Sequence, residues 1–277
     1  MLYPAELRGH MGICLSQLGR RRHALATLLA AMSLCAVAHG PAVAAACGAG
    51  AEKAEPVAVS GVREDGGIVL ADGRAVRLSD IVLPPPPWRE DVLAAIAPVA
   101  AEAYALLPRD GRPDRHGRLP GNLLLKQDAT LSWRLAEKGL ALAMPEEREP
   151  CGEAILAAEA EARAAGAGLW AQGGFEVLPA EDPARILLRR GEFVLVEGTV
   201  LSLGERPRRT YLNFGTFWNE DFTAYIDTDT VAEIAPEGHS LGDLVGRRVR
   251  IRGYVLDERG PAIAVSRPTQ LELVDDR

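Results

Sequence analysis

The stretch Val76–Trp88 reads VRLSDIVLPPPPW and decides how the N-terminal part of the chain is interpreted. Its first residues alternate between apolar and polar side chains, as in a half-buried β-strand, and Arg77 lies on the polar face. The four prolines Pro84–Pro87 then end the strand, because proline has no backbone N–H to donate to a sheet. The sequence therefore predicts a strand that carries one guanidinium group, followed by a rigid segment without ionisable side chains.

The residues before this stretch predict an antiparallel β unit over Val57–Leu83. Its turns fall at Asp65-Gly66-Gly67 and Asp72-Gly73, and the second of these is a strong two-residue hairpin signal. After the prolines, apolar residues at helical spacing predict a helix over Trp88–Leu107.

Three further elements are predicted before residue 170. Arg118–Leu125 is short and extended, Leu131–Gly139 has helical spacing with glycine as its stop, and Gly152–Ala167 is an alanine-rich helix. We expect this last helix to pack its apolar side chains inward and to leave its acidic residues in water.

Beyond a linker at Gly173–Pro183, the pattern becomes all-β. The predicted strands are Phe193–Val200, Arg209–Phe214, Phe222–Asp227, Val249–Val255, Ala262–Val265 and Leu271–Val274. Short strands at this density are typical of a small barrel, such as the oligonucleotide/oligosaccharide-binding (OB) type.

The first 44 residues are typical of an export leader. Arginines at Arg20–Arg22 precede the apolar run Ala24–Ala38, and Ala42-Val43-Ala44 matches the small-residue pattern of a cleavage site. The apolar run is shorter than the roughly 20 residues of a membrane span. We therefore expect a periplasmic or secreted protein, and an uncleaved leader that anchors the chain in the membrane is the alternative.

Two cysteines remain after the leader, Cys47 and Cys151. An even pair in an oxidising compartment predicts a disulfide, and a lipidated Cys47 is the alternative. The sequence has no C-x-x-C pair and only five scattered histidines, so it indicates no metal site built from Cys and His.

The charge balance disfavours nucleic acid as the main ligand. The chain has a formal net charge of −7, and removal of residues 1–44, with four arginines and one glutamate, leaves it near −10. Binding to phosphates is an electrostatic effect that depends on Lys and Arg. The expected partner is an envelope protein or an anionic ligand, and nucleic acid is the disfavoured alternative.

The order of these elements resembles the thermonuclease family, whose members are related to micrococcal (staphylococcal) nuclease. The resemblance covers roughly Val57–Trp170 and rests on two motifs together, DRHGR at Asp114–Arg118 and EAILAAEAEARAAGAGLW at Glu153–Trp170. It implies a five-stranded OB-type barrel with three helices, and calcium-dependent cleavage of DNA and RNA.

With the second barrel, the expected fold class is α+β. The expected parts are a leader at 1–44, a thermonuclease-like domain at 57–171, a linker at 172–184 and a C-terminal OB-like domain at 185–277.

The family's chemistry uses two arginines, two aspartates and one glutamate. The arginines hold the scissile phosphate and stabilise charge in the transition state. The aspartates bind calcium through hard oxygen ligands, and the glutamate orients or deprotonates the attacking water.

The resemblance places the two phosphate-binding arginines on Arg77 and Arg118. At the positions of the calcium carboxylates and the glutamate, this chain has Gly66, Val82 and Pro85. The resemblance therefore implies that the phosphate-binding groups remain while the cofactor ligands and the general base are absent, as in a pseudoenzyme.

Nearby acids are the alternative source of a rearranged site. Asp65 lies in the turn and Glu90 follows the prolines, whereas alternation places Asp80 on the opposite face of the strand from Arg77. Both arginines could also form ordinary surface ion pairs with acids of the neighbouring turns. His116, in the DRHGR turn, is expected to face solvent.

Six aromatic residues gather in the second barrel, close to several arginines. We expect Phe214, Phe222 and Tyr225 to fill the core, and Phe217 and Trp218, in a loop, to form a surface for binding.

Three functions remain open at this point. The first is an exported binding or scaffold protein without classical calcium-dependent nuclease activity. The second is an endonuclease with a rearranged site, and the third is a metal-free binder of single-stranded nucleic acid.

Overall fold

The computed structural model describes residues 47, 51–109, 111–126, 129–147, 151–217, 219–236 and 238–274. The predicted leader lies outside the described residues. All described residues belong to one compact unit, His39–Arg277. Across these ranges, the search for a helix long and apolar enough to cross a membrane finds none.

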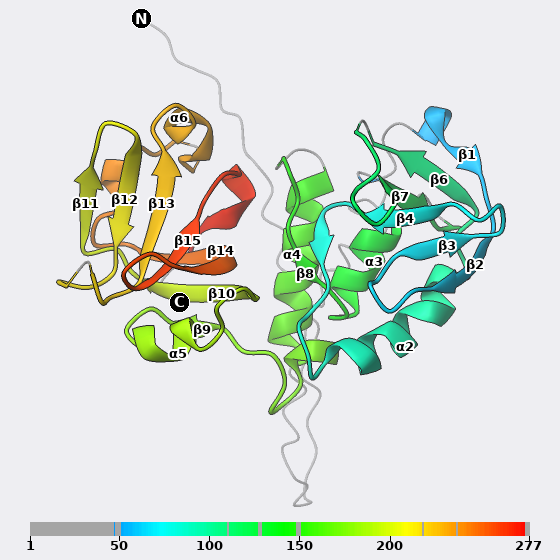
Figure 1. The fold of residues 1–277 in the computed structure, drawn as a ribbon, viewed down its shortest axis with the longest axis horizontal. Helices are drawn as coiled ribbons and strands as arrows, with labels where there is room; N and C mark the ends of the chain where they lie inside the picture. The colour runs from blue at the N-terminus through cyan, green and yellow to red at the C-terminus, as the bar shows by residue number, and fades with distance from the viewer. Residues whose placement is uncertain are drawn as a thin grey trace, which may run out of the picture. The chain divides into compact units, whose positions relative to one another are not determined.

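The first sheet has six strands in the order β1-β6-β7-β4-β3-β2 (Figure 1). The strands are β1 (Glu55–Pro56), β2 (Val59–Val62), β3 (Ile68–Leu70), β4 (Ala75–Leu78), β6 (Ala105–Pro108) and β7 (Arg118–Leu124). The chain enters as the antiparallel meander β2–β3–β4 and returns so that β7 runs parallel to β4. Helices α2 (Arg89–Ala100), α3 (Leu131–Glu137) and α4 (Cys151–Ala164) accompany this sheet, with a short 3-10 turn η1 (Ala51–Lys53) before it.

The predicted strand does not run through to Leu83. It ends at Leu78, and Asp80 takes a positive φ of 71°, which turns the chain out of the sheet. The next two residues form β5 (Ile81–Val82), which pairs with β8 (Leu142–Ala143) in a separate two-stranded sheet. The polyproline segment therefore follows β5 and not a strand of the first sheet.

The predicted helix Trp88–Leu107 is too long. It ends at Ala100, and β6 follows it and pairs with β7. Leu106 fits the helical spacing, but it also fits a buried strand, and the hydrogen bonds to β7 decide between the two. Short apolar runs of this kind do not distinguish helix from strand.

The two other predicted helices are confirmed with small changes at their ends. Thr130 caps α3 by accepting a hydrogen bond from the backbone N–H of Trp133, and Gly139 ends it with a φ of 65°. Helix α4 ends before Gly166, and the 3-10 turn η3 (Gly168–Trp170) follows. Ile155, Leu156 and Leu169 pack into the core of the first sheet, as expected.

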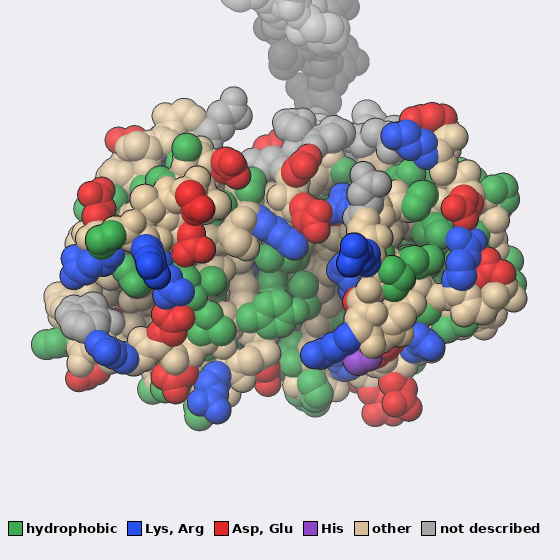
Figure 2. All heavy atoms as spheres, turned by 45° about the horizontal axis from the view of Figure 1, so that its top comes forward, with side chains coloured by type: hydrophobic (Ala, Val, Ile, Leu, Met, Phe, Trp, Pro, Cys, Tyr) green, Lys and Arg blue, Asp and Glu red, His purple; other side chains and the backbone are tan. Residues whose placement is uncertain are grey.

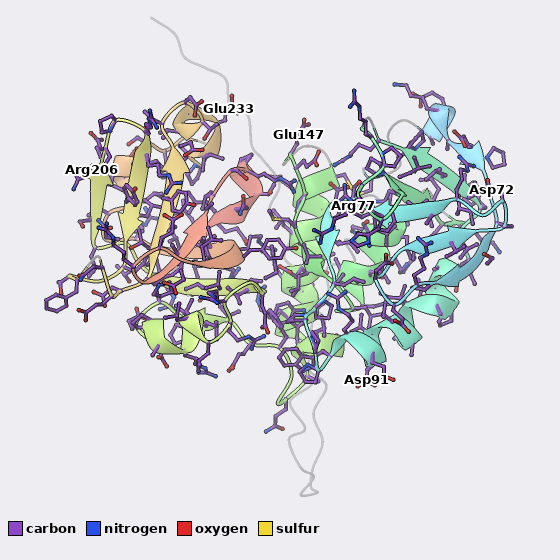
Figure 3. All side chains as sticks on the ribbon, viewed as in Figure 1. Asp72, Arg77, Asp91, Glu147, Arg206 and Glu233 are labelled. Atoms are coloured by element: carbon purple, nitrogen blue, oxygen red, sulfur yellow. A yellow bond between two sulfur atoms is a disulfide. The ribbon has the colours of Figure 1, made fainter. Side chains whose placement is uncertain are left out.

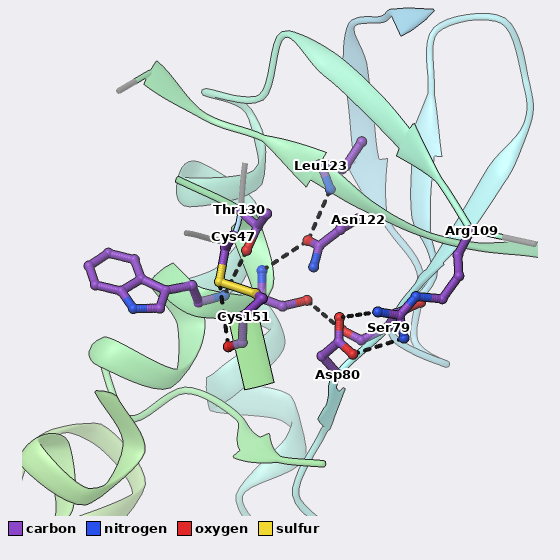
Figure 4. The surroundings of a disulfide bond; sticks show 10 residues. Cys47, Ser79, Asp80, Arg109, Asn122, Leu123, Thr130 and Cys151 are labelled. Carbon is purple, nitrogen blue, oxygen red and sulfur yellow. Dashed lines mark hydrogen bonds and ion pairs between the residues drawn. A yellow bond between two sulfur atoms is a disulfide. The ribbon is translucent and has the colours of Figure 1, made fainter. Parts of the chain in front are cut away.

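The Cys47–Cys151 disulfide is present and joins the start of the described chain to the first residue of α4 (Figure 4). It closes a loop of 104 residues, which in the chain-entropy model stabilises the fold by a few kcal/mol. Because its sulfur is in the disulfide, Cys47 does not carry a lipid in this structure.

The second sheet has eight strands, with a main path β11-β12-β13-β15-β14-β10-β9 and with β16 paired to β14 (Figure 1). The strands are β9 (Leu178–Pro179), β10 (Phe193–Thr199), β11 (Ser202–Glu205), β12 (Arg209–Asn213), β13 (Thr223–Asp227), β14 (Arg248–Asp257), β15 (Pro261–Ala264) and β16 (Leu271–Leu273). The short helices are α5 (Pro183–Leu187), α6 (Val231–Ile234), η4 (Leu241–Leu244) and η5 (Pro268–Gln270). The sequence missed β9 and β11, which are too short or too polar to show a period.

The α+β class is confirmed, with an OB-type unit followed by a second β unit. Each sheet has its own cluster of buried apolar side chains. One cluster extends from Cys47 to Phe175 and adds Phe193 and Leu195, and the other lies between Leu178 and Leu271.

Helix α4 corrects one expectation. Its Glu159 is fully buried and not in water, because Arg252 of β14 reaches it with Nη1 2.8 Å from Oε2. Arg252 is itself fully buried, donates from Nη1 to the carbonyl of Ala143 at 2.7 Å and pairs with Glu272. A charge buried in this way is stable only when it is paired and hydrogen-bonded. The buried pair therefore fastens β14 to α4.

Candidate functional site

Arg77 and Arg118 lie on adjacent parallel strands. In the register of β4 and β7, Ala75 faces Arg118 and Arg77 faces Pro120. Both side chains line one pocket of about 430 Å³. Figure 3 labels Arg77. Arg89, from the first turn of α2, and Arg115, from the DRHGR turn, line the same pocket. The fold thus brings together the two predicted arginines and adds two more.

Arg118 is held in place by neighbouring acids. Its Nε donates to Asp114 Oδ2 at 2.8 Å, its Nη2 lies 2.8 Å from the same oxygen, and its Nη1 donates to the carbonyl of Asp65 at 2.8 Å. Its side chain is 14% exposed. Arg118 therefore forms a fixed positive wall of the pocket, and its donors already have partners.

The Asp114–Arg118 pair stays ionised over a wide pH range. Burial alone would raise the pKa of Asp114, but hydrogen bonds from the Arg118 side chain and from the backbone N–H groups of Arg118 and His116 outweigh it. Together they lower the pKa of Asp114 from 3.8 to about 2. The pair is therefore intact at any physiological pH.

Arg77 is the more available cation. Its side chain is 47% exposed, and its nearest acid is Asp114, with Nε 3.9 Å from Oδ2. Among the described residues, no ion pair engages Arg89 or Arg115, although Arg115 Nε donates to His116 Nε2 at 3.1 Å. His116 is exposed at the rim, as expected for a turn residue.

The pocket is apolar around Gly66, the position at which the resemblance implies the first calcium carboxylate. A Cβ built on Gly66 would lie 2.2 Å from Leu83 Cδ1, and Gly66 has a φ of +81°. Val82 lines the same pocket, and Pro85 is buried. A carboxylate at position 66 would therefore collide with Leu83 unless that side chain moved away.

The nearby acids do not rebuild a calcium site. Within the described ranges, no group of three His, Cys, Asp or Glu side chains is arranged to hold a metal ion. Asp65 accepts from the backbone N–H of Gly67 at 2.9 Å and faces Arg118 at 3.5 Å. Calcium prefers six to eight oxygen ligands. The residues present at this pocket do not fit calcium.

Asp80 lies outside the pocket, because it follows the end of β4 at a positive φ and is not part of the alternating strand. Its Oδ1 is 2.9 Å from Nη1 of Arg109, and Figure 4 shows this pair beside the disulfide region. Burial raises the pKa of Asp80, and the nearby Arg109 partly offsets that rise. Glu90 is exposed on α2 and does not line the pocket.

Basic side chains gather beside a histidine on the surface over the first sheet (Figure 2). One residue of the second sheet joins the pocket lining, Tyr254 of β14. It is 52% exposed, and its ring lies edge-on to Phe193 at 5.4 Å. The sequence did not indicate Tyr254, because its place depends on how β14 docks on the first sheet.

The aromatic residues of the second sheet are divided between core and surface. Phe214 and Phe222 are in the core, as expected. Tyr225 is buried as well, as expected, and its hydroxyl donates to Glu258 Oε1 at 3.1 Å. Phe217 is 65% exposed. Trp218 lies outside the described residues.

Comparison with known protein families gives one match. Residues 97–172 match the family model described as staphylococcal nuclease homologue. The matched part contains both motifs, and it begins after the segment from Gly66 to Pro85. No curated protein matches the chain. The chain therefore carries a domain of the staphylococcal nuclease homologue family, the thermonuclease-like family.

Proposed function

We propose that this is an exported thermonuclease-like protein that binds a phosphate-bearing anion in the arginine pocket and does not hydrolyse phosphodiesters by the calcium route. One observation carries the proposal. Leu83 packs over Gly66, so the floor of the pocket is apolar where a calcium carboxylate is required. The guanidinium groups that would hold a phosphate remain around it.

The two halves of nuclease chemistry have different requirements. Arginines can hold the phosphate and stabilise the charge that develops on it. Hydrolysis also needs a group that orients or deprotonates water. Four arginines line the pocket, and its single lining carboxylate, Asp65, faces Arg118. Binding is therefore supported better than cleavage.

The pocket suits a small anion better than a long polyanion. Its basic character is local, because the whole chain has a net charge of −7. Tyr254 adds an aromatic wall next to the cations. A compact ligand with one or two phosphates would contact Arg77, Arg89 and Arg115 without meeting the acidic remainder of the surface.

Export is part of the same proposal. The leader pattern and the pairing of Cys47 with Cys151 both fit an oxidising compartment, where disulfides persist. We place the protein in the periplasm or outside the cell.

A nuclease of altered mechanism is the second candidate, and His116 is the observation that favours it. Its imidazole lies at the pocket rim, beside Arg115. Histidine is the side chain most often used to move a proton near neutral pH. A nuclease of this kind would work without calcium and would lose activity on His116→Gln.

Two measurements on the purified protein test the proposal. Single-stranded DNA should not be cleaved with millimolar calcium, and pyrophosphate should bind in a calorimetric titration. Arg77→Gln should weaken pyrophosphate binding by about tenfold, since it removes a charged donor. Arg247→Gln is the control, because Arg247 is exposed and does not line the pocket.

Calcium-dependent cleavage that disappears in Arg118→Ala would overturn the proposal. Cleavage that is independent of calcium and lost in His116→Gln would establish the second candidate instead. Equal pyrophosphate affinity in Arg77→Gln and the native protein would remove the arginine pocket as the binding site.

A further inference from the structure

A hollow of about 700 Å³ lies on the second sheet, away from the arginine pocket. It is built by side chains that face each other across neighbouring strands. Tyr211 of β12 faces Tyr225 of β13. Two residues further along β12, Asn213 faces Thr223. Gly204 of β11 faces Tyr211 from the other side. These residues lie on the sheet face opposite the core, because their neighbours Leu212 and Ala224 are core residues.

Small residues keep the hollow open. A Cβ on Gly204 would meet its nearest neighbours at 3.5 and 3.6 Å, which is ordinary contact, so a larger side chain would extend into the free space. Ala262 of β15 faces Thr223 from the opposite side. The turn between β14 and β15, at Glu258–Gly260, forms one wall.

A buried hydroxyl lines this hollow without a protein partner. Thr223 is 8% exposed, and within the described part of the chain its Oγ1 has no hydrogen-bond partner. Buried polar groups are nearly always hydrogen-bonded, since leaving one unpaired costs about 1–3 kcal/mol. Thr223 lines the hollow, but its Oγ1 has less than 1 Å² of accessible surface, so a ligand supplies the missing bond when a neighbouring side chain moves aside.

The charges around the hollow are mixed. Asp221, Asp257 and Glu258 line it together with Arg206 and Arg259. Figure 3 labels Arg206, which lies in the turn between β11 and β12. A polyanion would meet the carboxylates and a polycation would meet the guanidinium groups. A ligand whose polar groups both donate and accept hydrogen bonds fits this lining better than either.

We propose that this hollow binds a short neutral oligosaccharide. Each sugar hydroxyl can donate and accept, and so can pair with Thr223 Oγ1 and with the planar side chains of Asn213 and Asp257. The apolar face of a sugar ring can pack on the partly exposed ring of Tyr211.

The same geometry disfavours a peptide strand. A peptide would add to a free sheet edge through backbone hydrogen bonds. The hollow lies over β12 and β13 instead, and each of these strands is already paired on both sides. The ligand is therefore recognised through side chains, as a sugar is.

Calorimetric titration of the full protein with chitotetraose, cellotetraose and maltotetraose tests the proposal. At least one should bind, with an affinity that does not fall between low and high salt. Thr223→Val should weaken that binding by about tenfold and leave the thermal midpoint unchanged or higher, because Oγ1 has no partner to lose. Gly204→Leu should abolish binding by filling the hollow.

Thr199→Val is the matched control, because Thr199 lies on β10 outside the hollow. It should leave the affinity unchanged. The proposal fails if none of the three sugars binds at about 10 mM, a limit that corresponds to very weak affinity. It also fails if binding survives both Thr223→Val and Gly204→Leu. Salt-dependent binding of an octathymidylate that Thr223→Val weakens would replace the sugar with a nucleic acid.

Discussion

The arginine pocket of the first sheet is lined by more arginines than carboxylates, whereas the hollow of the second sheet is lined by more carboxylates than arginines. Four arginines and one aspartate line the pocket, whereas two arginines and three carboxylates line the hollow. Gly66, Val82 and Leu83 are among the apolar lining of the pocket, whereas the hollow is lined by two tyrosines together with Asn213 and Thr223.

This difference shows that the net charge of the chain does not determine what each region binds. An acidic chain can still present a local cluster of cations, because exposed charges more than a Debye length of about 8–10 Å apart are largely screened. We proposed an anion for the pocket and a neutral polar ligand for the hollow. The following changes test what each region depends on.

The largest effect is expected at the buried pair that joins the two regions. Arg252→Leu leaves Glu159 buried without its 2.8 Å partner, which should lower the free energy of unfolding by about 3–5 kcal/mol. Urea denaturation followed by tryptophan fluorescence measures this. Pyrophosphate binding should weaken as well, because β14 also carries Tyr254, which lines the pocket.

Arg248→Leu on the same strand is the control. Its side chain is 48% exposed and pairs with Glu197 at 3.2 Å, so its loss should cost less than about 1 kcal/mol. Equal destabilisation by the two substitutions would mean that the buried pair does not fasten β14 to α4.

A smaller effect is expected at the apolar floor of the pocket. Gly66→Ala combines a strained positive φ with a contact to Leu83, and should destabilise the protein by about 2–4 kcal/mol. Gly73→Ala separates the two causes, since Gly73 has a φ of +88° and no atom within 4 Å of its built Cβ. It should cost about 1–2 kcal/mol.

A double-mutant cycle compares the cost of Gly66→Ala in the native protein with its cost in Leu83→Ala. The steric part of that cost should be absent when Leu83 has been replaced by alanine. Thermal unfolding of the four proteins gives the coupling energy. If Gly66→Ala costs no more than Gly73→Ala, Leu83 does not fill the position of the family's carboxylate.

The smallest effect is expected at Asp114, which holds Arg118. Asp114→Asn removes an acid next to the pocket and releases guanidinium donors, so pyrophosphate should bind several-fold more tightly at pH 7. In the native protein, the affinity for pyrophosphate should not rise in this way between pH 5 and 8. Asp114 stays ionised over that range, because its pKa is lowered to about 2.

The same substitution has a predictable effect on acid stability. A carboxylate with a lowered pKa stabilises the folded state above its unfolded value of 3.8, and this contribution is lost as the pH falls toward about 2. The difference in stability between native protein and Asp114→Asn, at most about 1 kcal/mol for a partly exposed pair, should therefore vanish between pH 4 and 2. A constant difference across that range would contradict the pairing with Arg118.

The sequence by itself determined the elements with a clear period. Strands β10, β12, β13 and β14 and helices α3 and α4 lie close to the predicted positions, because their apolar residues repeat at the spacing of one face. The assignment of Gly66, Val82 and Pro85 to the family's carboxylate positions rests on the resemblance alone and stays a prediction, because the family match covers only residues 97–172.

The tertiary structure alone decided which distant residues meet. It placed Glu159 against Arg252, brought Tyr254 to the arginine pocket and, within the described residues, left Thr223 Oγ1 without a hydrogen-bond partner. It also ended α2 at Ala100, because Ala105–Pro108 pairs with β7. None of these contacts has a local signal: each depends on the packing of segments that lie far apart in the chain, and the free energy of that packing overrides the weak preference of a short segment for helix or strand.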